Sequence, residues 1–364
     1  MERLTVEPRA DWRARVEALG FDFHTIAGKT YWDETACYRF SADAVEHLDD
    51  VTAELERLCL QAVERVVAEE LYDRLGIPGI AREMIAQSWR EAERNVIGRF
   101  DLSWNGHNPP KLLEYNADTP TGLFEASVVQ WHWLEDTHAS ADQFNSLHEK
   151  LIVAWQKYGL DGAVHFTCVA NHAEDYATTT YLRDTCTQAD LETFFLTVDQ
   201  IGWNGIGFVD LDERPILNLF KLYPWEWLLR DKFGQHVASS HMRVIEPAWK
   251  MILSNKAILV LLWEMFEGHP NLLPASFEPK DIAGPCVEKP PLGREGQDVI
   301  IHPGPPERRP DRIYQALAPL PEFEGFHPVI GSWVIASQPA GIGIREEANL
   351  VTTNLSRFVP HYFD

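Results

Sequence analysis

The sequence predicts a mixed α+β / α/β protein built around more than one sheet. Three observations support this class: a helical first part, apolar runs that alternate with helix-like stretches between about residues 161 and 231, and short β-rich segments near the C-terminal end. A chain of 364 residues is too long for one minimal core, so we expect two or three lobes.

The first part of the chain has the apolar spacing of amphipathic helices. Ser41 is suited to cap a long helix that we expect to continue to Gly76, where glycine ends it. A second helix is predicted from about Pro78 to Arg94, with apolar side chains at helical spacing: Ile80, Met84, Ile85 and Trp89.

Strands dominate most of the remaining sequence. NVIGRFDLSW and KLLEYNAD predict two strands joined by the turn-rich link NGHNPP. The alternation from Asp161 to Asp231 is typical of an α/β layer, and SNKAILVLLWEMFEGHP predicts a short buried helix that ends at Gly268 and Pro270. The last β-rich segments are PCVEKP, DVIIH, IYQALAPL and WVIASQPAGIGIRE.

Composition limits the classes of partner. The net charge of −23 argues against binding of nucleic acid, because binding to phosphates depends on Lys and Arg. An acidic surface is compatible with a cationic small substrate, or it serves only to keep the protein soluble. No apolar run approaches the roughly 20 residues of a membrane span. The N-terminal residues lack the apolar core of a secretory signal, and the five cysteines include no C-x-x-C pair. We therefore expect a cytoplasmic protein with small-molecule partners.

The predicted hairpin brings two acids together. Residues two apart on a strand share a face, so a simple antiparallel register puts Asp101 near Glu114 and Arg99 near Asn116. Facing carboxylates repel, and a hard cation such as Mg²⁺, which prefers oxygen ligands, relieves the repulsion. On this interpretation, removing one acid should not lower stability. The alternative is a solvated hairpin face on which Arg99 pairs with one acid.

A glycine-containing loop follows the predicted strand PCVEKP. Gly293 and Gly296 allow the backbone N–H groups to approach phosphate oxygens, while Lys289 at the base of the loop and Arg294 within it add positive charge. The loop is not a Walker A motif, because no helix and no G-K-[ST] follow. An ordinary β-turn with surface charges is the alternative.

Two further polar residues lie near apolar elements. Lys256, near the start of the predicted apolar helix, offers a second cation, although lysines at such positions are often only solvated. Gln315 lies on a predicted strand, where it could contact an adenine edge or occupy the solvated face.

Five sequence blocks occur in the order expected of one known family. GRFDLSW, KLLEYNADTPTGLFEAS, SNKAILVLLWE, EKPPLGREG and QPAGIGIREEANLVTTNLSRFVPH together resemble the glutathionylspermidine synthase family of ATP-grasp carboxylate–amine ligases, over roughly residues 20 to 364. Bifunctional members also carry an amidase domain, for which we find no counterpart, so the chain resembles a stand-alone synthetase. The resemblance implies a helical region at 1–95, a metal-binding hairpin with a preATP-grasp-like α/β substrate layer at 96–250, and an ATP-grasp nucleotide lobe at 251–364.

The resemblance also implies roles for the residues in these blocks. Asp101, Glu114 and Asn116 match magnesium positions; Arg99 matches the arginine that steadies the transferring phosphoryl group. Lys256 and Lys289 match nucleotide lysines, Arg294 matches the arginine of the mobile glycine loop, and Gln315 falls near the adenine-contacting strand. The implied reaction passes the γ-phosphoryl group of ATP to a carboxylate, and an amine then attacks the acyl phosphate.

Substrate-binding residues are assigned from the same resemblance. Glu174 and Asp175 begin a helix after the strand VHFTCVA, where the family's acids meet a polyamine; acids in a first helical turn also favour the helix dipole without any ligand. Thr119 is assigned to the thiol peptide, Arg345 to a carboxylate or phosphate, and Glu346 to a cationic amine. The expected function is a glutathione–spermidine ligase; the alternatives are another peptide–amine pair and a catalytically silent nucleotide-binding protein.

Overall fold

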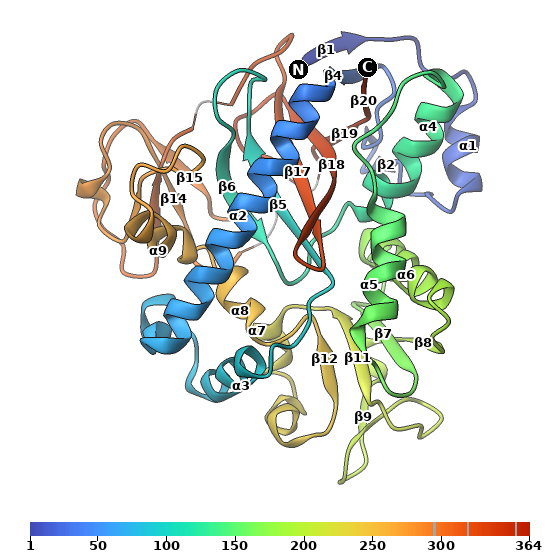
Figure 1. The fold of residues 1–364 in the computed structure, drawn as a ribbon, viewed down its shortest axis with the longest axis vertical. Helices are drawn as coiled ribbons and strands as arrows, with labels where there is room; N and C mark the ends of the chain where they lie inside the picture. Colours follow the sequence, from blue (N-terminus) through green and yellow to red (C-terminus); the bar gives the residue numbers. More distant parts are fainter. Residues whose placement is uncertain (294–295, 319, 354) are drawn as a thin grey trace.

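A twisted antiparallel sheet forms the centre of the molecule (Figure 1). The computed structural model describes residues 1–293, 296–318, 320–353 and 355–364. Within them, the central sheet has the order β19-β18-β17-β5-β6. Its strands are β5 (Ile97–Ser103), β6 (Lys111–Asn116), β17 (His327–Ile335), β18 (Gln338–Glu347) and β19 (Arg357–Val359).

The long helix α2 (Ala42–Ala68) packs against β17 and β18 through one apolar face. Ser41 caps it as predicted, because its side chain accepts the N–H of Ala44 at 3.3 Å. The predicted end at Gly76 was wrong. Glu70 adopts φ 53°, a left-handed conformation that breaks the α-helix, and a separate 3₁₀ helix, η1 (Leu71–Leu75), follows. The second helix, α3 (Gly79–Arg90), is shorter than predicted.

The α/β alternation is confirmed as a parallel four-stranded sheet in the order β12-β11-β7-β8. Its strands are β7 (Val164–Cys168), β8 (Thr193–Thr197), β11 (Asn218–Leu222) and β12 (Arg243–Ile245). Helix α6 (Ala173–Gln188) packs on β7 and on helix α5 (Leu147–Tyr158). Because β8 and β11 lie on opposite sides of β7, the loops after β7 and β11 diverge and leave a crevice at their carboxyl ends.

A third sheet, in the order β13-β16-β14-β15, packs against the apolar helix α9 (Ile258–Met265). Its strands are β13 (Ala275–Ser276), β14 (Cys286–Lys289), β15 (Ile300–His302) and β16 (Ile313–Ala316). The segment WVIASQPAGIGIRE, predicted as one β segment, instead turns back on itself. Ala336 and Ser337 have φ values of 47° and 61°, which make the tight turn between β17 and β18.

Both ends of the chain meet in a small sheet, β1-β4-β20, and lie close together in Figure 1. Its strands are β1 (Glu2–Thr5), β4 (Ala36–Phe40) and β20 (His361–Phe363). The minor strands are β2 (Thr25–Ile26), β3 (Lys29–Thr30), β9 (Gly202–Trp203) and β10 (Phe208–Val209). The remaining helices are α1 (Trp12–Ala18), η2 (Glu125–Val129, π-helical), α4 (Gln130–Thr137), η3 (Val198–Gln200), α7 (Trp225–Leu228), η4 (Gly234–Ser239), α8 (Lys250–Leu253) and η5 (Pro279–Asp281).

In the part of the chain that the structure describes, no helix combines the length and apolar character needed to cross a membrane. The division of the chain near residues 95 and 250 stays a prediction.

Candidate active site

The β5–β6 ladder has the register that the sequence predicts. Arg99 lies opposite Asn116, and Asp101 lies opposite Glu114, before a bulge shifts the pairing at Leu102. All four residues therefore belong to one small patch on the central sheet, facing the crevice between the sheets.

Asp101 lies between two arginines. Arg99 donates through Nε to Oδ1 at 2.7 Å and through Nη2 to Oδ2 at 3.1 Å. Arg345 reaches Asp101 from β18 across the sheet, with Nη2 3.2 Å from Oδ2. Arg99 and Asp101 are buried, with side chains 9% and 5% exposed. Arg99 thus pairs with one acid, as the sequence alternative predicts, but the pair is buried and does not lie on a solvated face.

Glu114 has its own cation. Lys256 Nζ lies 3.0 Å from Glu114 Oε2, and Asn116 Nδ2 donates to both Glu114 and Asp101 at 3.3 Å. Burial by itself raises the pKa of Glu114, but Lys256 and Lys289 outweigh burial and hold that pKa well below its usual range. Cationic side chains therefore already offset the repulsion between these acids, and the assignment of a magnesium ion to them stays a prediction.

The oxygen atoms of Asp101, Glu114 and Asn116 are still suited to bind Mg²⁺. Among the described residues, no group of three or more His, Cys, Asp or Glu side chains is placed to hold a metal. Asp101, Glu114 and the Asn116 amide nevertheless offer three hard oxygen donors in one patch once the amide is turned over. Mg²⁺ is usually held by one or two carboxylates together with water and phosphate oxygens, which this set fits.

Lys256 also connects the glycine loop to the hairpin. Its backbone N–H donates to Pro291 O at 2.8 Å, and its Nζ donates to Gly293 O at 2.9 Å. Gly296 has φ 70°, and a Cβ there would stand 2.6 Å from the carbonyl oxygen of Thr352, so this position requires glycine. Arg294 lies outside the described residues.

Lys289 and Gln315 form a buried pair under the glycine loop. Lys289 Nζ donates to Gln315 Oε1 at 2.7 Å and to Leu113 O at 2.8 Å, while Gln315 Nε2 donates to Leu112 O at 3.0 Å. Gln315 is therefore not on a solvated face, and its amide is already engaged within the protein. Burial lowers the pKa of Lys289 to about 8, although Glu114 opposes this change.

Two adjoining cavities surround these groups. The first extends from the hairpin to the parallel sheet, with lining side chains that include Arg99, Lys256, Arg345, Thr119, Glu174 and Asp175. The second is more apolar and lies between the third sheet and the segment 350–352, with Lys289 and Gln315 in its wall. Glu114, Gly296 and Thr352 line both cavities and mark where they meet.

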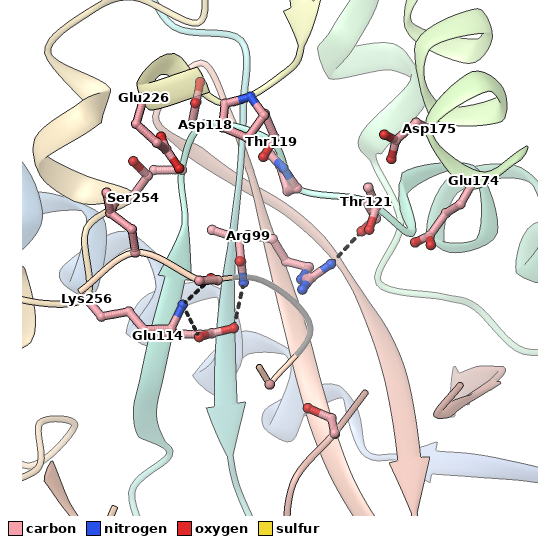
Figure 2. A pocket seen from close by; sticks show the side chains of 18 of the residues that line it. Arg99, Glu114, Asp118, Thr119, Thr121, Glu174, Asp175, Glu226, Ser254 and Lys256 are labelled. Carbon is pink, nitrogen blue, oxygen red and sulfur yellow. Dashed lines mark hydrogen bonds and ion pairs between the residues drawn. The ribbon is translucent and has the colours of Figure 1, made fainter. Parts of the chain in front are cut away.

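The first cavity is lined by both cationic and acidic side chains. Figure 2 shows Glu174 and Asp175 projecting from the start of α6 on the side opposite Lys256 and Glu114. Sequence reasoning missed Glu226, Ser254 and Asp118, which also line this cavity. Glu226 lies in the first turn of α7, shortly after β11, so the rule that placed Glu174 after β7 could have found it.

The structure does not bring Glu346 to the cavity. Neighbouring residues of a strand point to opposite faces, so Glu346 points away from the face of Arg345. It is fully buried and accepts bonds from Arg3 at 2.9 Å, Arg357 at 2.6 Å and Tyr38 at 2.7 Å. This saturated ion cluster ties β18 to the N-terminal sheet, and we leave Glu346 out of the proposed site.

The fold and the cavity define an α/β protein with an oppositely charged crevice between its sheets. A solved structure of a glutathione synthetase-like effector from Globodera pallida is similar in fold, with a TM-score of 0.55 over 90% of this chain and 89% of the other, at 11% identity. That likeness concerns the fold alone.

The chain belongs to the glutathionylspermidine synthase preATP-grasp family, whose model matches residues 3–364. A Haemophilus influenzae protein provisionally named acid–amine ligase is 38% identical, with both chains covered completely. Trypanothione synthetase of Crithidia fasciculata is 28% identical over 96% of this chain and 61% of its own length. The bifunctional glutathionylspermidine synthetase/amidase of Escherichia coli is 26% identical over 89% of this chain and 58% of its own. The chain thus spans less than two-thirds of these two longer relatives.

Proposed function

We propose that this protein is an ATP- and Mg²⁺-dependent C–N ligase that joins a glutathione-like peptide carboxylate to a spermidine-like amine through an acyl phosphate. Family membership supports the reaction class. The single observation that carries the proposal is the first cavity, which is lined by the cations Arg99, Lys256 and Arg345 and in which the carboxylates of Glu174 and Asp175 lie opposite Lys256. Such a cavity accommodates an anionic reacting group beside an amine that carries a second, protonated nitrogen.

The hairpin wall is assigned to phosphoryl transfer. Asp101, Glu114 and Asn116 would hold magnesium, which when bound supplies charge that draws phosphate oxygens toward the carboxylates. Arg99 and Arg345 lie beside Asp101 and are suited to neutralise the charge that develops on the transferring phosphoryl group.

The glycine loop and the second cavity are assigned to the nucleotide. Lys256 lines the first cavity and Lys289 lines the second, and both act electrostatically on Glu114, which lines both cavities. Gly293 and Gly296 would present backbone N–H groups to phosphate oxygens, with Arg294 added from the same loop. Gln315 lines the apolar cavity, which has the character required by a base.

The acidic wall is assigned to the amine, and Thr119 to the peptide donor. Glu174 and Asp175 lie at the carboxyl end of the parallel sheet, where ligands bind in open α/β folds. Their charge would hold an ammonium group while the neighbouring amine reaches the acyl phosphate. Enclosing the reaction between both walls would also keep water from the acyl phosphate.

A coupled assay of ADP release tests the proposal. Purified protein with ATP and Mg²⁺ is assayed with a panel of γ-glutamyl peptides, each with spermidine and with a monoamine of similar length. We expect turnover that requires both a peptide and an amine. If no combination stimulates turnover, the ligase assignment fails; if only other pairs do, the glutathione–spermidine assignment alone fails.

The amine wall has its own test. Glu174→Gln combined with Asp175→Asn should raise the amine KM at least tenfold and leave ATP affinity within about twofold, because charge-assisted hydrogen bonds contribute roughly 1.5–3 kcal/mol each. The matched control is Glu83→Gln with Glu91→Gln, two exposed acids within and directly after α3 whose replacement changes the net charge equally. An equal effect of both double variants would indicate only a general influence of net charge.

A further inference from the structure

A buried ion pair joins the loop after β6 to the carboxyl end of β11. Lys221 Nζ lies 2.6 Å from Asp118 Oδ1, and the backbone N–H of Trp225 donates to Asp118 Oδ2 at 2.9 Å. The two side chains are 1% and 4% exposed. Lys221 Nζ also lies 4.8 Å from the centre of the Trp225 ring. Both carboxylate oxygens of Asp118 thus bind groups on the parallel-sheet side of the molecule, one on β11 and one on α7.

The contacts continue to the start of the hairpin. Trp225 Nε1 donates to the backbone oxygen of Glu246 at 3.0 Å. The Glu246 carboxylate accepts the N–H of Ile97 at 2.8 Å, and Lys250 Nζ lies 2.8 Å from it. Since Ile97 begins β5 and Asp118 follows β6, the network holds the open end of the hairpin against β11, α7 and the residue after β12.

The hairpin side and the parallel-sheet side of the first cavity meet at this network. Thr119 follows Asp118 and Glu226 follows Trp225, and both of these neighbours line the first cavity. Figure 2 shows Asp118, Thr119 and Glu226 grouped beside one another, between the strands of the hairpin and the parallel-sheet side. Asp118 itself also lines the first cavity, so the network forms part of the cavity wall.

Stability alone does not require charges here. Replacing a buried ion pair with apolar groups of similar size is often neutral or stabilising, because both ions must give up water. A fully hydrogen-bonded ionic network does, however, define one relative placement of the elements that it joins. Reaction between bound partners is sensitive to such placement, and a misplacement of about 1 Å can cost about a hundredfold in rate.

We propose that the Asp118–Lys221 pair is a positioning element that sets the separation between the phosphoryl-transfer wall on β5 and β6 and the amine wall at the start of α6. This inference rests on the proposed ligase function. When the separation is correct, the amine nitrogen attacks the acyl carbon, phosphate leaves and the amine loses a proton. When the separation is incorrect, water attacks the acyl phosphate instead, and ATP is consumed without amide formation.

The test is the ratio of amide formed to ADP released at saturating amine. The variant is Asp118→Asn with Lys221→Met, which removes both charges together and leaves neither buried ion without its partner. We expect the ratio to fall from close to one to below about 0.1, with ATP affinity changed by less than about threefold. Lys221→Arg keeps the charge and should retain most of the coupling.

The matched control is Arg9→Met with Glu34→Gln. This pair is buried to a similar degree, with side chains 9% and 0% exposed, and lies outside both cavities. A purely structural role for Asp118–Lys221 predicts a lower Tm in both double variants with coupling unchanged in both, and that result would overturn the proposal. If the Asp118/Lys221 double variant does not fold, unchanged coupling in Lys221→Met alone would overturn it equally. A parent protein without any amine-dependent turnover would instead remove the ligase proposal on which this one rests.

Discussion

Lys256 Nζ lies 3.0 Å from Glu114 Oε2 and 2.9 Å from the carbonyl oxygen of Gly293, so one ammonium group joins the hairpin to the glycine loop. Lys256→Met should therefore weaken ATP binding by about tenfold or more, since it removes a charge next to the phosphates and a contact of the loop. Lys256→Arg should bind more tightly than Lys256→Met. Isothermal calorimetry measures both, with Lys280→Met, an exposed lysine, as the control. Equal affinity in Lys256→Met and the parent would exclude Lys256 from the nucleotide site.

The two acids of the hairpin should respond differently to neutralisation. Asp101→Asn leaves the buried Arg99 guanidinium without a charged partner and should lower the free energy of unfolding by about 3 kcal/mol. Glu114 is 27% exposed, and Glu114→Gln should cost about 1 kcal/mol or less. Both variants should lose ligation. Urea unfolding gives the stabilities, and equal losses in the two variants would contradict the assigned pairing.

Nucleotide binding should depend on a divalent cation. Without one, the triphosphate would approach the carboxylates of Asp101 and Glu114 directly, which is electrostatically unfavourable. We expect ATP affinity in excess Mg²⁺ or Mn²⁺ to exceed that in EDTA by at least tenfold. The same titration with Glu114→Gln should show a smaller difference. Identical affinities in EDTA and magnesium would remove the metal assignment.

The segment 290–297 should exchange amide hydrogens more slowly when ATP and magnesium are bound. We expect this because phosphate oxygens would accept hydrogen bonds from the backbone N–H groups of the loop, which protects those groups from exchange. Hydrogen exchange followed by mass spectrometry measures the change, with a peptide from α2 as the internal reference. Exchange that nucleotide leaves unaltered would exclude a closing role for the loop.

The buried Glu125 should make stability depend on pH. Burial and the Glu174 carboxylate raise the pKa of Glu125 to about 7 from an ordinary value of 4.5, although the Tyr31 hydroxyl and Arg345 oppose them. The Tyr31 hydroxyl donates to Glu125 Oε1, whereas Glu125 Oε2 has no hydrogen-bond partner among the residues that the structure describes, so the neutral form is favoured in the folded protein. The folded state therefore holds this proton more tightly than the unfolded state.

Stability contributed by that proton is complete below about pH 4.5 and is lost as pH rises through about 7, by roughly 3 kcal/mol in total. Glu125→Gln keeps an acceptor for Tyr31 and cannot ionise. The stability difference between parent and variant should therefore change across pH 5–8 in favour of the variant. Glu91→Gln, an exposed acid, is the control. A difference that is constant with pH would contradict a neutral Glu125.

The sequence by itself determined those features that depend on nearby residues. The period-two placement of Arg99, Asp101, Glu114 and Asn116 predicted the observed hairpin register, because strand geometry sets which residues face one another. Ser41 predicted its helix start for a similarly local reason. The order of the motif blocks indicated the family, which the comparison of the whole chain confirmed.

Only the tertiary structure decided which charges meet across distant segments. Arg345 reaches Asp101 because β17 places β18 in the same sheet as β5, and Lys221 meets Asp118 because β11 ends beside the loop after β6. Glu346 was misassigned for the same reason, since its partner Arg3 comes from the other end of the chain. Local periodicity determines the face on which a side chain lies, whereas its partner is determined by long-range packing, which brings together residues far apart in the sequence.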